Sequence, residues 1–168
     1  MRPMFVFLVA KMLGKGKVNE RSFRGASVIE LIHTATLVHD DVVDSAKMRR
    51  GSASINEKWS GQVAVLMGDF LLAKALNILV EIGDLRALSV VSKATQRLSV
   101  GEIFEIQIGE QHDVRESSYF SMVNDKTASL ISASVCLGPI FSKADESVIA
   151  SMRKYGELLG AAFQIADD

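Results

Sequence analysis

Apolar residues recur at helical spacing along most of the chain, and few segments alternate between apolar and polar residues as strands do. This pattern predicts helices over residues 4–14, 20–44, 55–59, 63–82, 85–108 and 119–137, and a last helix from residue 145 onward. Residues 49–52 are expected in a loop. Pro3 suits a first helical turn, and Gly138-Pro139 is expected to end a helix. We therefore expect an all-α bundle in a single domain over residues 1–168.

The composition is that of an ordinary globular domain, with 48% hydrophobic residues and a net charge of −1 at pH 7. Near-zero charge without a basic cluster argues against nucleic acid as a partner. Cys136 is the one cysteine, and its apolar neighbours favour a core thiol in a reducing compartment. No apolar run is judged long enough for a transmembrane segment, so we expect a cytoplasmic protein.

Three aspartates stand at the end of the strongly apolar helix expected over residues 20–44. Asp40 and Asp44 are four residues apart and share a helix face, whereas Asp41 points roughly 100° away. Two such carboxylates repel each other unless a cation lies between them, and carboxylates with substrate phosphates are a usual Mg²⁺ environment. A solvated acidic turn is the alternative, but unpaired charge after so apolar a helix would be costly.

Basic and imidazole side chains accompany these aspartates. The planar guanidinium groups of Arg49 and Arg50 suit diphosphate oxygens, and neighbouring side chains diverge, so the two arginines need different partners. His33 lies seven residues before Asp40, on the same face about 10 Å away. It is either a ligand-binding group or a satisfied core histidine. Carboxylates beside arginines indicate a bound magnesium–diphosphate.

Residues 31–44, LIHTATLVHDDVVD, followed by Arg49-Arg50-Gly51, resemble the first aspartate-rich motif of the trans-isoprenyl diphosphate synthases, most of all the long-chain polyprenyl diphosphate synthases. Arg2-Pro3, Gly68-Asp69 and Lys126-Thr127 also match family motifs. Residues 163–168, FQIADD, resemble the start of the second aspartate-rich motif. The resemblance implies an antiparallel helical bundle of the isoprenoid synthase type. It also implies that the chain is about the N-terminal half of a synthase, truncated at both ends.

The resemblance also implies roles for individual residues. The catalytic set would be Asp40, Asp41, Asp44, Lys126 and Asp167. Roughly two to three Mg²⁺ ions would be held by Asp40, Asp44, Asp167 and Asp168. The allylic diphosphate would contact Arg49, Lys126, Thr127 and Gln164. Isopentenyl diphosphate would contact Arg2, His33 and Arg50.

Two further segments match the family less informatively. Glu102 belongs to a Gly-Glu-x-x-Gln region in which Glu105 occupies the glutamine position, and no catalytic role is assigned there. Asp69, inside an apolar helix, is expected to pair with a basic group or to cap a neighbour.

The implied reaction is the Mg²⁺-dependent condensation of an allylic diphosphate with isopentenyl diphosphate, by ionisation, condensation and elimination. Ala35 and Thr36 lie about one helical turn before Asp40 and are small, so we expect the product tunnel to continue past them. Ile32, Val28 or Phe104 would form a deeper floor. The predicted product is longer than farnesyl, a quinone side-chain precursor. A homodimer and a peripheral membrane contact during product release are expected.

Two alternatives remain open. Class I terpene cyclases share the DDxxD motif but lack the arginine pair and the Lys-Thr pair, because they bind no second diphosphate. A non-catalytic or regulatory subunit that packs on a partner synthase is the other alternative. The intact aspartates and arginines argue against a degenerate protein.

Overall fold

The computed structural model describes residues 1–167 and confirms the all-α fold class. The helices are α1 (Arg2–Leu13), α2 (Glu20–Val43), α3 (Ile55–Lys58), α4 (Gly61–Ile82), α5 (Leu85–Gln111), α6 (Glu116–Val123), α7 (Ser129–Phe141) and α8 (Glu146–Asp167). A π-helical segment, η1 (Asn124–Ala128), joins α6 to α7. Two short strands, β1 (Met48–Arg49) and β2 (Ser52–Ala53), form an antiparallel hairpin between α2 and α3.

Local signals explain several helix limits. The Asn19 side chain accepts a hydrogen bond from the backbone N–H of Ser22 at 2.9 Å and so caps the start of α2. Asp84 caps α5 in the same way, by accepting from the N–H of Arg86 at 3.0 Å. Gly83, with φ of 66°, ends α4 in the left-handed conformation that glycine adopts at low cost.

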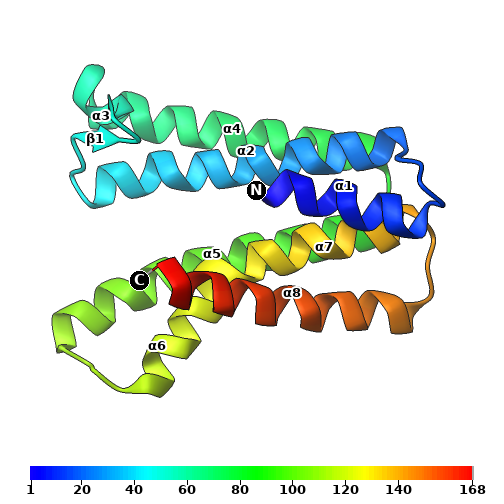
Figure 1. The fold of residues 1–168 in the computed structure, drawn as a ribbon. Coiled ribbons are helices and arrows are strands. Elements are labelled where there is room, and N and C mark those ends of the chain that lie inside the picture. The colour runs from blue at the N-terminus through cyan, green and yellow to red at the C-terminus, as the bar shows by residue number, and fades with distance from the viewer. Residues whose placement is uncertain (168) are drawn as a thin grey trace.

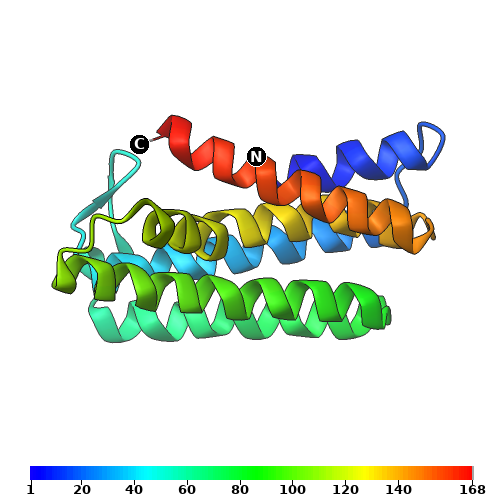
Figure 2. The same cartoon turned by 90° about the horizontal axis from the view of Figure 1, so that it is seen from below.

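Helices α2 and α4, α7 and α8, and α1 and α2 run antiparallel to each other, whereas α1 and α7 run in the same direction (Figure 1). The main pairings are α2 with α4, α7 with α8, and α1 with both α7 and α2. Figure 2 shows α7 between α1 and α8 on one side and α5 on the other. The C-terminal ends of α2, α5 and α8 all point toward the end of the bundle that carries the hairpin and α6 (Figure 1). Side chains of these three helices can therefore meet there.

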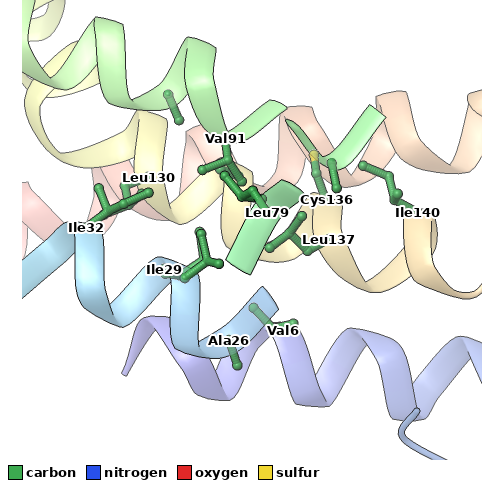
Figure 3. Close-up of a cluster of buried hydrophobic side chains, with 14 of the residues drawn as sticks. Val6, Ala26, Ile29, Ile32, Leu79, Val91, Leu130, Cys136, Leu137 and Ile140 are labelled. Atoms are coloured by element: carbon green, nitrogen blue, oxygen red, sulfur yellow. The ribbon is translucent and has the colours of Figure 1, made fainter. Parts of the chain in front are cut away.

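Helix α7 is the centre of the core, because all thirteen of its residues are buried. Figure 3 shows Leu130, Cys136, Leu137 and Ile140 of α7 together with Ile29 of α2 and residues of α1, α4 and α5. The prediction that Cys136 is a core thiol is confirmed.

The predicted helix over residues 119–137 is wrong in two respects. The helical run begins at Glu116 and contains the π-helical segment η1. It also continues through Gly138 and Pro139 to Phe141. Packing of α7 on its neighbours outweighs the helix-breaking tendency of proline. Gly138 contributes, because a Cβ there would lie 2.8 Å from the backbone nitrogen of Ala10 in α1.

The expectation that no segment reaches transmembrane length is also wrong, as far as length and composition go. Helix α4 has 22 residues and a mean hydropathy of 1.9 over an 18-residue window. Core helices of bundles meet the same two criteria, and α4 packs along α2 through Ala64, Gly68 and Ala75. Only 22% of the window is buried, so much of the apolar surface of α4 is exposed.

Helix α8 approaches the preceding segments closely at Gly160, where an added Cβ would lie 2.4 Å from the Cα of Ala128. Backbone cannot rotate away as a side-chain end can, so the Gly160→Ala protein should lose about 1–3 kcal/mol of unfolding free energy. Gly109→Ala is the matched control, because nothing lies within 4 Å of a Cβ there. Its helical position predicts a gain of about 0.5–1 kcal/mol. Chemical denaturation measures both, and equal stabilities would contradict the close packing.

Candidate active site

The three aspartates at the end of α2 differ in burial, and their spacing puts Asp40 and Asp44 on one face and Asp41 on another. Asp41 is buried, Asp40 is half-buried and Asp44 is exposed. The Asp41 carboxylate forms an ion pair with Arg49, with 2.7 Å from Nε and 2.5 Å from Nη2 to Oδ1. Asp41 is therefore engaged with the hairpin, and Asp40 and Asp44 are left to face the interior of the site and solvent.

The hairpin separates the two arginines, which the sequence analysis expected to have different partners. Arg50 and Gly51 form its two-residue turn, with φ of 51° and 78°. Positive φ at both positions is the geometry of the tight hairpin turns that match strand twist. Arg49, in β1, is paired with Asp41. Burial is the main cause of the lowered pKa of both Arg2 and His33, and Arg50 lies close enough to lower both further.

The residues predicted for isopentenyl diphosphate come together. Arg2 donates a hydrogen bond from Nη1 to His33 Nε2 at 2.9 Å, since a guanidinium can only donate. Burial, followed by the positive charges of Arg2 and Arg50, lowers the pKa of His33 to about 4. The imidazole is therefore neutral at pH 7. Arg2 Nε is buried and has no hydrogen-bond partner within residues 1–167.

A cavity of about 280 Å³ adjoins this cationic cluster. Its lining residues are Glu30, His33, Thr34, Leu37, Val38, Asp41, Arg49, Arg50, Ala53, Ser54 and Ile55. Two guanidinium groups and a neutral imidazole at one cavity form a donor-rich surface that can hold the oxygens of an anionic group.

Asp40 faces a second charged group, on α5 and η1. Burial raises the pKa of Asp40 to about 6; the carboxylates of Glu102 and Asp44 add to the rise, while Lys126 and Arg49 oppose it. Glu102, half-buried on α5, likewise has a pKa raised by burial. Negative charge is thus crowded at this point, and a cation would relieve the repulsion.

Lys126 is the cation nearest to these carboxylates. Its ammonium group forms an ion pair with Glu102 at 3.0 Å and a second, shorter one with Glu105. Burial by itself would lower the pKa of Lys126, but the hydrogen bonds that its ammonium group donates to the two glutamates raise it overall. The lysine is charged and doubly paired.

Thr127 and Gln164, both predicted at the allylic diphosphate, are in direct contact. The Thr127 hydroxyl donates to Gln164 Oε1 at 2.8 Å, which joins η1 to α8. The π-helical turn that carries Lys126 and Thr127 is therefore tied to the helix that carries Asp167.

The predicted metal ligands are not gathered into one cluster. Within the described residues, no group of three or more His, Cys, Asp or Glu side chains lies close enough to hold a metal ion. Asp167 is exposed at the end of α8, and Asp168 lies outside the described residues. Like-charged carboxylates have no reason to converge without a cation between them.

An apolar cavity of about 240 Å³ lies among α2, α4 and α5, one helical turn from Ala35 toward the start of α2. It is lined by Ile32, Leu72, Ala75, Leu76, Leu79, Val91, Ser92, Thr95, Gln96 and Ser99. Of the three predicted floor residues, Ile32 lines it, whereas Val28 and Phe104 do not. Ala35 is fully buried, and the Thr36 hydroxyl donates to the His33 carbonyl at 2.9 Å.

Sequence reasoning missed the two glutamates that hold Lys126. Glu102 and Glu105 are three residues apart on α5 and so share one face of that helix, which was the available signal. Asp69 was expected to pair with a basic group or to cap a neighbour; its carboxylate lies 3.5 Å from His39 Nε2, a contact that is an ion pair when the imidazole is protonated.

The polyprenyl synthetase family model matches residues 1–168. The chain is 35% identical to a geranylgeranyl diphosphate synthase of Saccharolobus solfataricus, over 100% of this chain and 52% of the relative. It is 39% identical to heptaprenyl diphosphate synthase component 2 of Geobacillus stearothermophilus, over 99% and 52%.

Its structure is similar to that of a polyprenyl synthase from Caulobacter crescentus solved with calcium and isoprenyl diphosphate. The TM-score is 0.94 at 35% identity, over 99% of this chain and 50% of that one. The chain thus spans about half the length of these relatives. The family model matches all 168 residues of this chain, and the fold is shared with that structure. The chain therefore belongs to the polyprenyl synthetase family.

Proposed function

We propose that this chain forms part of an enzyme that condenses an allylic prenyl diphosphate with isopentenyl diphosphate. The observation that carries the proposal is that two separate cationic groups flank one acidic helix end. Arg2, His33 and Arg50 form one group, and Lys126, in η1, is a separate cation close enough to Asp40 to act on its pKa. Two anion-binding groups beside one acidic turn fit a reaction between two diphosphate substrates.

The residues at the acidic turn fit Mg²⁺ as the cofactor. Asp40 and Asp44 are crowded by Glu102, so a divalent cation would be stabilised by charges already in place. Mg²⁺ commonly takes only one or two carboxylates together with substrate phosphates, so a three-residue cluster is not required. Asp40 and Asp44, with Asp167 from α8, are the residues proposed to hold it. The Caulobacter relative was solved with calcium and isoprenyl diphosphate, which supports a divalent cation together with a prenyl diphosphate as ligands.

The proposed mechanism needs no nucleophilic side chain. Bound Mg²⁺ would neutralise the allylic diphosphate as its C–O bond breaks. Arg49, Lys126, Thr127 and Gln164 would hold the leaving diphosphate by charge and hydrogen bonds. Arg2, neutral His33 and Arg50 would orient isopentenyl diphosphate, whose double bond attacks the allylic carbon. Loss of a proton from the new cation then completes one addition.

Two other functions are weaker. A terpene cyclase binds a single diphosphate, so the Arg2–His33–Arg50 group would have no second diphosphate to bind. A subunit that works with a partner chain has more support, since one relative is named as component 2 of a heptaprenyl diphosphate synthase. In that case the chain would still contribute the acidic turn.

The product is proposed to be longer than farnesyl. Ala35 and Thr36 place no bulky group below the acidic turn, and an apolar cavity continues beyond Ile32. Named relatives make geranylgeranyl and heptaprenyl products, so family membership by itself does not fix the length.

A homodimer is proposed to cover the exposed apolar side of α4. Leu66, Phe70 and Val80 are 62–71% exposed, and their spacing puts them on one side of that helix. Contiguous exposed apolar surface of this kind marks association sites. Sedimentation of the purified protein as a monomer at micromolar concentration would contradict the proposal.

The direct test incubates the chain with Mg²⁺, farnesyl diphosphate and labelled isopentenyl diphosphate, alone and within the longest reading frame that carries it. Labelled polyprenyl products are expected in at least one of the two forms. Pyrophosphate release without isopentenyl incorporation would favour the cyclase. Absence of both would favour the subunit without its own activity.

The Asp40 carboxylate is expected to lower the stability of the metal-free protein but to be needed for activity. Its raised pKa means that the ionised form destabilises the metal-free fold, a cost absent below about pH 4 and complete above about pH 6. After discounting for its partial exposure, Asp40→Asn should stabilise the metal-free protein by about 1 kcal/mol at pH 7.5. The gain should vanish at pH 4.

The same substitution should lower Mg²⁺-dependent condensation by about a hundredfold or more. Denaturation at the two pH values and the labelled assay measure these effects, and a pH-independent gain would contradict the assigned pKa.

Ala35→Phe is expected to shorten the product, because the ring would enter the proposed path below the acidic turn. Thr36→Ser is a matched control that keeps the tunnel open. Chromatographic sizing of the labelled products compares the variants. An unchanged product distribution in Ala35→Phe would rule out this position as part of the tunnel.

A further inference from the structure

Among the residues that the structure describes, Lys126 is the one cation of the proposed site that is held by two carboxylates on another helix. Its ammonium group is paired with both Glu102 and Glu105 of α5. The side chains of Lys126, Glu102 and Glu105 are partly enclosed, with 30%, 26% and 44% of their surfaces exposed, respectively. A diphosphate that binds Lys126 must compete with these carboxylates for the same ammonium protons.

The fold brings α5 close to the lysine backbone. A Cβ on Gly101 would lie 2.4 Å from the backbone nitrogen of Lys126 and 2.8 Å from its Cα. Only glycine permits this approach. Lys126 also sits inside the π-helical segment η1, and such segments alter side-chain direction and often occur at functional sites. The contact between Lys126 and the next turn of α5 is therefore built into the backbone packing.

The two glutamates are not equivalent. Glu102 also faces Asp40 and contributes to its raised pKa. Glu105 also pairs with Lys126, but it is not among the groups that act most strongly on the pKa of Asp40. A change at Glu105 therefore alters the restraint on Lys126 with little direct effect on the acidic turn.

We propose that Glu105 is a positioning residue that competes with bound diphosphate for the Lys126 ammonium group and so weakens diphosphate binding. The inference deepens the proposed function and rests on Lys126 facing a diphosphate. In the ligand-free protein Glu105 turns the ammonium toward α5. Diphosphate binding releases that ion pair and leaves Glu102 as the remaining carboxylate partner.

The experiment measures binding of inorganic pyrophosphate by calorimetry, in the presence of Mg²⁺, to the wild-type protein and to the Glu105→Gln variant. Loss of one partly exposed ion pair predicts about twofold to fivefold tighter binding in the variant. Glu110→Gln is the matched control, because it removes the same charge from an exposed position on α5. Its pyrophosphate affinity should match that of the wild type.

A double-mutant cycle with Lys126→Gln tests whether Glu105 acts through the lysine. The effect of Glu105→Gln should disappear in the Lys126→Gln background. Persistence of the effect there, equal or weaker binding by Glu105→Gln, or no binding by either protein would overturn the inference.

The outcome is separable from that of the proposed function. Tighter pyrophosphate binding by Glu105→Gln without condensation would support competition between Glu105 and diphosphate, and it would argue against the synthase function. Condensation together with an unchanged pyrophosphate affinity in Glu105→Gln would support the synthase function and argue against competition between Glu105 and diphosphate.

Discussion

The ion pair between Asp41 and Arg49 organises the polar end of the bundle. It joins the last turn of α2 to the hairpin, and the Asp41 side chain is only 7% exposed. Loss of Arg49 would leave a buried carboxylate unpaired, which is far more costly than breaking an exposed pair. Asp41 is held against the hairpin, whereas Asp40, about 100° away around α2, faces Glu102 and Lys126 instead. Because Arg49 is fixed in β1, the tight turn that follows directs Arg50 toward His33 and Arg2.

Around that fixed pair, the site retains charges that do not favour the ligand-free fold. Asp40 is half-buried beside Glu102, and Arg2 keeps a buried N–H without a partner within the described part of the chain. Groups of this kind lower stability unless something else satisfies them. A cation at the carboxylates and an anion at the guanidinium groups would satisfy both. The unfavourable features of the metal-free molecule thus agree with the ligands of the proposed reaction.

The core provides the rigidity that such a site needs. Helix α7 is buried along its whole length, and small residues let α1, α5 and α8 approach it or the adjoining η1 segment closely. The Thr127–Gln164 hydrogen bond and the close contact at Gly160 both tie η1 to α8. The side chains proposed to hold the leaving diphosphate therefore lie on segments, η1 and α8, that hold each other in place. The exposed apolar side of α4 is the surface proposed for association.

The sequence by itself determined the helical class, most helix limits and the chemistry of the acidic and basic motifs, because periodicity and residue type are local properties. It also indicated that Arg49 and Arg50 have different partners, since adjacent side chains diverge. Only the tertiary structure decided that α7 continues through Pro139, because packing on α1, α2, α5 and α8 outweighs a local helix-breaking preference. It likewise decided that Arg49 binds Asp41 and that Glu102 and Glu105 hold Lys126. These pairs join residues that are 8 to 24 positions apart in the chain, and their distances depend on how whole helices pack against one another.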